Sequence, residues 1–232
     1  MPVYNEASVI DDVIADVTKF ILDEVPDSEL VIVDDRSTDT TPGLLGEHVE
    51  RDGRIRVLFN ASNSGHGRSL RRAIDASSGA WIFHLDSDGQ VDVSEFGLLW
   101  DRRVDSDLVL GVRVTRHDPV HRLILTRLTR TVISILARRR VIDANVPFKL
   151  IKRELYEHLS PSIPPTVFAP SILIVLGAYR SGARVTEVVT THLARRHGKS
   201  TLRFKRLAAA VARTTLETLT FSRRLLPPYE PH

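Results

Sequence analysis

Two pairs of aspartates, each directly after a hydrophobic run, are the residues of this chain best suited to chemistry. Asp86 and Asp88 form the first pair, and Gly89 and Gln90 follow them. Two carboxylates in an extended segment that bends at a glycine can converge on one hard cation, Mg²⁺ or Mn²⁺, which would clamp the diphosphate of a nucleotide. An Asp-x-Asp pair is a weak signal alone, because a polar turn that caps a helix near Val93 also accounts for it.

The second pair is Asp34 and Asp35. A carboxylate at this position can accept paired N–H donors from the edge of a nucleobase. Ser37, Thr38 and Asp39 come next and are typical capping residues, and we expect Thr38 and Asp39 to cap the following helix.

Two further features lie near these pairs. Residues 60–67 form a glycine-bearing loop that opens a helix and could approach a phosphate, although a simple turn explains the loop nearly as well. His84 stands two residues before the first aspartate pair. We expect it to be a core histidine with satisfied hydrogen bonds rather than a ligand.

The elements that must position these residues alternate between strand and helix in the first half of the chain. Hydrophobic runs predict strands at residues 29–33, 54–59, 80–85 and 107–112, and helical periodicity predicts helices at 7–23, 42–51 and 67–77. Strands separated by such helices imply crossover connections and an α/β fold with a mainly parallel sheet flanked by helices. Ligands bind beyond the carboxyl ends of such strands, so both aspartate pairs are expected on one rim.

The second half has a different pattern, with helices expected at 119–140, 168–180 and 205–226 and a strand at 184–191. Helix 119–140 is basic and amphipathic, and it could lie at anionic lipid headgroups or pack its apolar face on the sheet. Helix 205–226 carries a neutral polar face at Thr214, Thr215, Glu217 and Thr218, which favours packing or a homodimer contact.

The start of the chain is unusual. Residues 2–6 resemble a strand-to-helix turn, yet only Met1 precedes them, where a first strand of about five residues would ordinarily stand. Either the start is truncated or the sheet forms without that strand.

Composition and charge narrow the class of protein. The 232 residues include no cysteine, which excludes disulfides and thiolate sites, and no run is long and apolar enough for a membrane span or a signal peptide. Residues 1–110 carry 10 Lys and Arg against 22 Asp and Glu, whereas residues 111–232 carry 22 against 7. An acidic half suits a metal and a basic half suits phosphates or an anionic membrane, so we expect a cytoplasmic protein, peripheral on the inner face of the membrane.

Taken together, the motifs resemble those of family 2 glycosyltransferases with the GT-A fold. The matching segments are residues 2–6, 34–39, 63–67 and 86–90 in the first half. In the second half, Arg130-x-x-x-Ser134, Asp143 before Phe148–Lys149, and Arg195-x-x-Gly198-x-Ser200 resemble the dolichyl-phosphate mannosyltransferase branch. Each motif is weak, but their common order and spacing over nearly the whole chain are specific.

The resemblance implies a role for each matching position. Residues 1–115 would be the nucleotide-sugar half, 116–204 the acceptor half, and 205–232 a C-terminal amphipathic helix and tail. The nucleoside would be held by Pro2, Tyr4, Glu6 and one of Asp34 and Asp35. The metal and the sugar diphosphate would be held by Asp86, Asp88 and Gln90. The phosphates would be met by Arg113, Arg130, Ser134 and Arg195, with Lys149 and Ser200 as further substrate-binding residues.

The activity implied is inverting transfer of a hexose from a nucleotide sugar, of the GDP-mannose or UDP-glucose type, to a polyprenyl (dolichyl-like) phosphate. An acceptor phosphate is already an anion, so it needs positioning and charge neutralisation but no general base. The sequence departs from the family pattern at Val146–Pro147 and at Ser171.

Other functions stay open at this point. The same fold could use a hydroxyl acceptor, for which Asp143 is the candidate base, or could bind nucleotides without catalysis. A receiver module does not account for the second half, and nucleic-acid binding is disfavoured because the 14 aromatic residues are not concentrated in the basic half.

Overall fold

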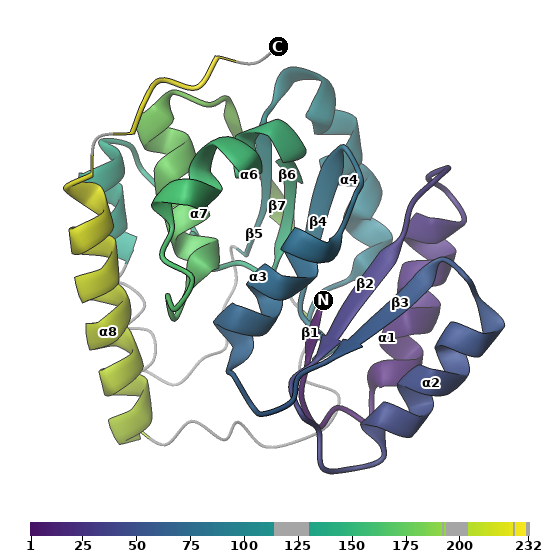
Figure 1. The fold of residues 1–232 in the computed structure, drawn as a ribbon. Helices are drawn as coiled ribbons and strands as arrows, with labels where there is room; N and C mark the ends of the chain where they lie inside the picture. Colours follow the sequence, from purple (N-terminus) through teal and green to yellow (C-terminus); the bar gives the residue numbers. More distant parts are fainter. Residues whose placement is uncertain (114–129, 192, 194–203, 225, 231–232) are drawn as a thin grey trace.

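The computed structural model describes residues 1–113, 130–191, 193, 204–224 and 226–230, and these form a layered α/β fold. Two sheets lie side by side with helices against their faces (Figure 1). The predicted α/β class with a flanked sheet is confirmed.

The first sheet has the order β1-β2-β3 and is parallel throughout. Its strands are β1 (Pro2–Val3), β2 (Leu30–Asp34) and β3 (Ile55–Phe59), and the crossovers contain α1 (Ile10–Val17), extended by a π-helix (Thr18–Leu22), and α2 (Thr41–Arg51). All five residues of β2 are buried, which is typical of a central parallel strand covered on both faces. The sheet therefore holds the end of β2 in the interior, where its aspartates must find partners.

Strand β1 has two residues in place of the expected five, and it pairs with β2 through Pro2 and Val33 and through Val3 and Asp34. The amino group of Met1 continues this pairing by donating to the carbonyl of Val31 at 2.8 Å. A cavity of about 480 Å³ adjoins Met1 and is lined by residues of β2, α3 and β4. The first sheet thus forms with a short edge strand beside an apolar cavity.

The second sheet has the order β4-β6-β5-β7. Its strands are β4 (Trp81–Leu85), β5 (Leu108–Arg113), β6 (Phe148–Lys152) and β7 (Val185–Thr190). Strand β6 is antiparallel to both of its neighbours, whereas β5 and β7 are parallel. No strand was predicted at 148–152, because Lys149 interrupts the apolar run, yet this lysine is fully buried.

The helices that follow are α3 (His66–Ala76), α4 (Phe96–Arg102), α6 (Arg153–Leu159), α7 (Pro170–Ser181) and α8 (Phe204–Ser222). Helix α7 confirms the helix predicted at 168–180 and is buried almost all round, with Pro170 in its first turn and Gly182 as a left-handed C-cap at φ +85°. Helix α3 approaches α7 closely at Gly67, where a Cβ would lie 2.3 Å from the carbonyl oxygen of Phe168. Glycine is required here by close backbone contact.

Helix α8 differs from the expectation in its orientation. The residues expected on its polar face include Thr214 and Thr218, which are buried, while Leu216 is 66% exposed and Leu219 is 40% exposed. Buried Phe221 anchors the helix, and the hydroxyl of Thr218 donates to the carbonyl of Thr214 within the helix, so the Thr218 hydroxyl is buried without losing a partner. Among the described residues, no helix combines the length and apolarity of a membrane span.

Candidate functional site

The carboxyl ends of β1, β2 and β4 meet at one rim of the molecule. Asp34 is the last residue of β2, and Asp86 directly follows β4. The hydroxyl of Ser87 donates to the carbonyl of Pro2 at 3.0 Å, which ties the loop after β4 to β1. Because β1 pairs with β2, this contact brings the two aspartate pairs to neighbouring strand ends.

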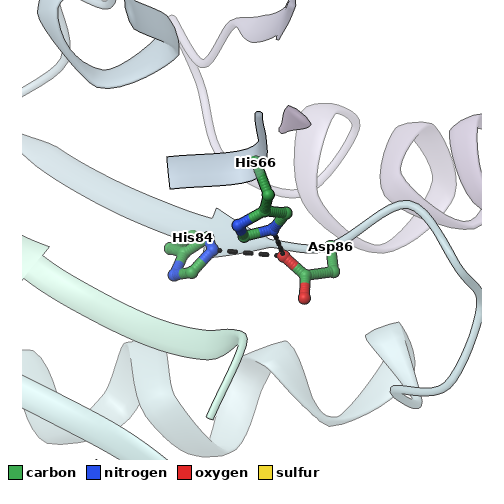
Figure 2. Close-up of side chains that lie close together, drawn as sticks. All are labelled: His66, His84 and Asp86. Carbon is green, nitrogen blue, oxygen red and sulfur yellow. Dashed lines mark hydrogen bonds and ion pairs between the residues drawn. The ribbon is translucent and has the colours of Figure 1, made fainter. Parts of the chain in front are cut away.

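Asp86 lies between two histidines that come from different elements (Figure 2). Nε2 of His66, the first residue of α3, lies 2.9 Å from Asp86 Oδ1. Nε2 of His84, in β4, lies 3.3 Å from the same oxygen. The three ligand atoms are all within 4.8 Å of one another. The sequence singled out Asp86 but neither histidine as part of the site.

The charges in this cluster depend on one another. Burial alone would raise the pKa of Asp86, but the neighbouring His66 and His84 hold it well below its usual value. Burial lowers the pKa of His84 to about 4, so its imidazole is neutral at pH 7. Desolvation would also lower the pKa of His66, yet the carboxylate of Asp86 outweighs it and the net shift is upward. Asp86 is therefore ionised at neutral pH.

His84 is a core residue, as expected, but its hydrogen bonds are not satisfied. The residue is 3% exposed, and its buried Nε2 makes no hydrogen bond to any residue that the structure describes. The expectation of a satisfied histidine is wrong at Nε2, because its 3.3 Å contact with Asp86 Oδ1 does not have the geometry of a hydrogen bond.

Asp88 directly precedes a sharp turn at Gly89, whose φ is +64°. Its Oδ1 accepts the backbone N–H of Gln90 at 3.2 Å, and the carbonyl of Gln90 accepts the N–H of Leu193 at 2.9 Å. The charge of Asp88 also acts on His66, which places this carboxylate near the cluster. The roles of Asp88 and Gln90 in binding a metal stay predictions.

Asp35 is the anchor of the glycine-bearing loop rather than a free acceptor. Its Oδ1 accepts bonds from the Asn60 amide at 2.7 Å, the Ser64 N–H at 2.7 Å and the Ser64 hydroxyl at 2.9 Å. Its Oδ2 accepts the N–H of Gly65 at 2.7 Å. Burial would raise the pKa of Asp35, but these hydrogen bonds lower it below the usual value. The loop predicted to approach a phosphate is held in place by this carboxylate.

Asp34 is arranged differently from its neighbour. Its Oδ2 accepts the N–H of Ser37 at 3.1 Å, whereas its buried Oδ1 has no hydrogen-bond partner among the described residues. Of the two aspartates, Asp34 is the one with a carboxylate oxygen that makes no hydrogen bond to a described residue.

The turn after β1 interlocks with the segment after β2. Asn5, at φ +55°, donates its backbone N–H to the Ser37 hydroxyl at 2.9 Å and accepts the N–H of Thr38 at 2.7 Å. Asp39 accepts the N–H of Thr41, the first residue of α2, at 3.0 Å, but the N-cap position itself is Thr40, which makes no capping bond with its side chain. The predicted capping role is wrong for Thr38, because its hydroxyl bonds Asn5 instead of the start of α2.

The other predicted nucleoside contacts surround this turn. Pro2 is buried in β1, and Tyr4 is 46% exposed, with its ring free to stack on a flat ligand. Glu6 is half-buried, and its backbone N–H donates to the Thr41 hydroxyl at 3.0 Å.

In the second half, Arg130 and Ser134 come together with the three arginines at 138–140. Residues 130–137 are helical, and this part of the expected helix 119–140 buries Ile133. Ser134 Oγ accepts the N–H of Val141 at 3.1 Å, which folds the arginine run back along the helix. Arg130, Ser134 and residues 138–140 line a hollow of about 470 Å³, which we call the arginine hollow. The rest of the expected helix, residues 119–129, is outside the described residues.

Lys149 is not at a surface. Its ammonium donates to the carbonyl of Ala144 at 3.1 Å and to the hydroxyl of Ser171, in the interior between β6 and α7. Asp143 is 6% exposed. Arg195, Ser200 and the side chain of Arg113 lie outside the described part of the chain, so their predicted roles stay predictions.

The comparisons first define the class of fold. The structure is similar to glucosyl-3-phosphoglycerate synthase from Mycobacterium tuberculosis in complex with phosphoglyceric acid, with a TM-score of 0.72 at 20% identity, covering 95% of this chain and 78% of that one. A crystal structure of the same synthase with Mn²⁺, uridine-diphosphate and phosphoglyceric acid gives a TM-score of 0.71 at 22% identity, covering 96% and 76%. These likenesses show the GT-A fold.

A sequence profile of glycosyl transferase family 2 matches residues 1–162, and the chain belongs to this family. It is 25% identical over 213 residues to a dolichyl-phosphate beta-glucosyltransferase from Dictyostelium discoideum, covering 81% of this chain and 63% of the relative. It is 26% identical over 204 residues to a dodecaprenyl-phosphate galacturonate synthase from Rhizobium johnstonii, covering 86% and 60%. The chain therefore spans less than two thirds of the length of these relatives.

Proposed function

We propose that this chain is an inverting glycosyltransferase that moves a hexose from a nucleotide-diphosphate sugar to a polyprenyl phosphate, with a divalent cation as cofactor. The observation that carries the proposal is the division of the family 2 fold into an acidic rim after β1, β2 and β4 and the arginine hollow in the other half. The relatives named for dolichyl phosphate and dodecaprenyl phosphate support this class of acceptor.

The acidic rim suits the donor. Tyr4 would stack on the base, and Asp34 Oδ1 would accept a base N–H, since it is the oxygen left without a partner. Asp86, Asp88 and Gln90 would hold the cation, and the donor set of ionised carboxylate and neutral imidazole around Asp86 fits a divalent metal. When bound, such a cation would offset the negative charge of the departing nucleoside diphosphate.

The arginine hollow suits the acceptor. Arg130 and the arginines at 138–140 present guanidinium groups that match phosphate oxygens, and a cluster of such charges attracts anions from a membrane surface. One acceptor phosphate oxygen would bond to the anomeric carbon as the carbon–oxygen bond to the diphosphate breaks, with inversion at that carbon. The nucleoside diphosphate leaves as an anion, and no proton needs to be removed from the acceptor.

The alternative with a hydroxyl acceptor requires a base. Asp143 was the candidate, and it is 6% exposed. The anionic acceptor is the better match to the described residues, because the guanidinium groups of the arginine hollow suit an anion.

Thermal stabilisation by nucleotides tests the donor half of the proposal. We expect UDP or GDP at about 100 times its Kd, with Mn²⁺, to stabilise the fold by about 2.7 kcal/mol. For a chain of this size that corresponds to a rise in Tm of about 5–10 °C. Asp88→Ala should abolish the metal-dependent part of the rise. If neither nucleotide shifts the Tm with metal, the proposed donor site is wrong.

Transfer of a labelled sugar to polyprenyl phosphate in vesicles tests the acceptor half. Arg130→Gln should reduce the transfer rate by tenfold or more, a lower bound of about 1.4 kcal/mol for a lost charge-assisted contact, while nucleotide stabilisation is unchanged. Arg223→Gln is the matched control, because Arg223 is an exposed arginine that does not line the hollow. Equal losses in both variants would contradict the placement of the acceptor.

A further inference from the structure

We propose that His66 and His84 join Asp86 as ligands of one divalent transition-metal ion, held by His66 Nε2, His84 Nε2 and Asp86 Oδ1, and that this site prefers Mn²⁺, Co²⁺ or Zn²⁺ to Mg²⁺. The two histidines are not among the carboxylate and amide ligands that the sequence implied. The inference deepens the proposed function. It rests on that function only for the nucleotide diphosphate that would occupy the remaining coordination positions of the ion.

The distances are those of neighbouring ligands around one ion. With metal–ligand bonds of about 2.1 Å, two ligands are about 3.0 Å apart at a right angle and about 3.4 Å apart at a tetrahedral angle. The oxygen of Asp86 lies 2.9 Å from the His66 nitrogen and 3.3 Å from the His84 nitrogen. The two histidine nitrogens lie within 4.8 Å of each other, and two ligands of one ion can be at most about 4.2 Å apart at this bond length, so side-chain rotation would close any excess on binding.

The unsatisfied nitrogen of His84 is the second, independent observation. A buried polar atom without a partner ordinarily costs about 1–3 kcal/mol, and such atoms are rare unless an ion, water or ligand satisfies them. His84 Nε2 is buried, makes no hydrogen bond to a described residue, and faces the oxygen of Asp86 (Figure 2). A metal ion at this point would give the nitrogen its missing partner.

The site is buried on the side of His84 and open to solvent on the side of His66. The side chain of His84 is 3% exposed, whereas those of Asp86 and His66 are 29% and 57% exposed. An ion could enter from the side of His66 and would keep coordination positions toward solvent, which oxygens of Asp88 or of a diphosphate could fill. A closed structural site would not leave such positions.

The ligand chemistry determines which metals bind. Imidazole nitrogens suit Zn²⁺ and the first-row transition metals, with affinity rising from Mn²⁺ to Co²⁺, whereas Mg²⁺ requires near-octahedral oxygen ligands and loses its waters reluctantly. Two nitrogens among three protein ligands therefore disfavour Mg²⁺. If Asp86 and Asp88 alone bound the ion, Mg²⁺ would bind comparably.

The test is metal binding by the full chain, stripped of metal and free of nucleotide. We expect one Co²⁺ per chain, visible absorption bands of nitrogen-bound Co²⁺, and two histidine nitrogens in the cobalt X-ray absorption spectrum. His66→Asn should weaken Co²⁺ binding by at least 10–100-fold, roughly the loss seen even for residues that only orient a ligand. His66 is exposed, so this variant should keep its Tm, whereas His84→Asn adds a second measurement on the buried ligand.

His48→Asn is the matched control. His48 pairs with Asp11 at 2.8 Å, and the pair is not joined by a third ligand among the described residues. Its loss should leave Co²⁺ affinity unchanged. Oxygen-only coordination, equal affinity for Mg²⁺ and Co²⁺, or unchanged binding in His66→Asn would each overturn the site.

Separate experiments test the proposed function and the proposed metal site. Asp88→Ala should lose nucleotide stabilisation but keep His66-dependent Co²⁺ binding. Co²⁺ binding without any nucleotide effect would contradict the transferase and retain the metal site, and the opposite result would contradict the metal site alone.

Discussion

Asp35→Asn should destabilise the chain strongly, although it changes only one atom of a side chain that is 3% exposed. Both carboxylate oxygens of Asp35 accept hydrogen bonds, three at Oδ1 and one at Oδ2. Asparagine has one acceptor oxygen, so its amide group must face an N–H donor. The best orientation keeps the three bonds at Oδ1 and places the amide against the N–H of Gly65.

The magnitude follows from these four bonds. Losing one bond to a charged group costs about 1.5–3 kcal/mol, and the donor left unsatisfied adds to it, so we expect a total of about 3 kcal/mol. At roughly 2–4 °C per kcal/mol for this chain length, the Tm should fall by about 6–12 °C. Differential scanning calorimetry and urea unfolding would measure the loss.

Asp34→Asn is the matched control. Asp34 accepts a single bond, from the N–H of Ser37, and asparagine can keep it. The other oxygen has no described partner, so the change in stability should stay within about 1 kcal/mol. Under the proposed function the same variant should lose nucleotide affinity. Equal destabilisation by the two variants would refute the reasoning.

The pH dependence gives a further check on Asp35. Its pKa is lowered in the folded state, so its contribution is complete above the unfolded value of about 3.9 and is lost as the pH falls through the folded pKa. The difference between wild type and Asp35→Asn should therefore be constant from about pH 6 to 8 and should shrink below about pH 4. A difference that persists undiminished at the lowest pH would show that the charge of Asp35 is not responsible.

Three further predictions concern the framework. Gly67→Ala should lower the free energy of unfolding by about 1–3 kcal/mol in urea, because the added Cβ meets a backbone carbonyl. The control Gly46→Ala, on an open helical surface, should raise it by about 0.5–1 kcal/mol. A stabilised Gly67→Ala would contradict the close approach of α3 and α7. Asp107→Ala should cost about 1–3 kcal/mol, measured as a lower denaturation midpoint, since this 1% exposed carboxylate accepts two guanidinium hydrogen bonds from Arg184, which is itself 53% exposed and can be solvated when they are lost. Ser171→Ala should cost about 1–3 kcal/mol by removing a hydroxyl that accepts from the buried ammonium of Lys149, and an unchanged midpoint would show that this contact is dispensable.

Local patterns in the sequence were sufficient for the framework of the first half. The runs that predicted strands at 29–33, 54–59, 80–85 and 107–112 coincide with β2, β3, β4 and β5 to within a residue or two. Strand β2 is buried throughout and uniformly apolar up to Asp34, whereas β3 exposes Arg56 and Phe59 and still has an apolar run long enough to predict a strand. The aspartate rim follows from this pattern, because strands joined by crossover helices end at the same edge.

Strand β6 and the orientation of α8 were not predictable in this way. From the sequence alone, Lys149 is expected at the surface. In the structure its ammonium is buried and donates to the hydroxyl of Ser171, in α7, and to the carbonyl of Ala144. Thr214 and Thr218 likewise become buried residues only when α8 packs against α7. The ammonium of Lys149 is satisfied in part by the distant Ser171, whereas the hydroxyl of Thr218 is satisfied within its own helix by the carbonyl of Thr214.

The sequence by itself determined the α/β class, the positions of most strands, the two aspartate pairs and the likeness to family 2 glycosyltransferases, because these depend on neighbouring residues and on motif spacing. Only the tertiary structure decided which aspartate anchors a loop and which keeps an oxygen without a described partner, and only it brought His66 and His84 to Asp86. Hydrogen bonds and metal ligands act over about 3 Å, and residues 18 or 20 positions apart come within that distance only when α3 and β4 pack at the same rim.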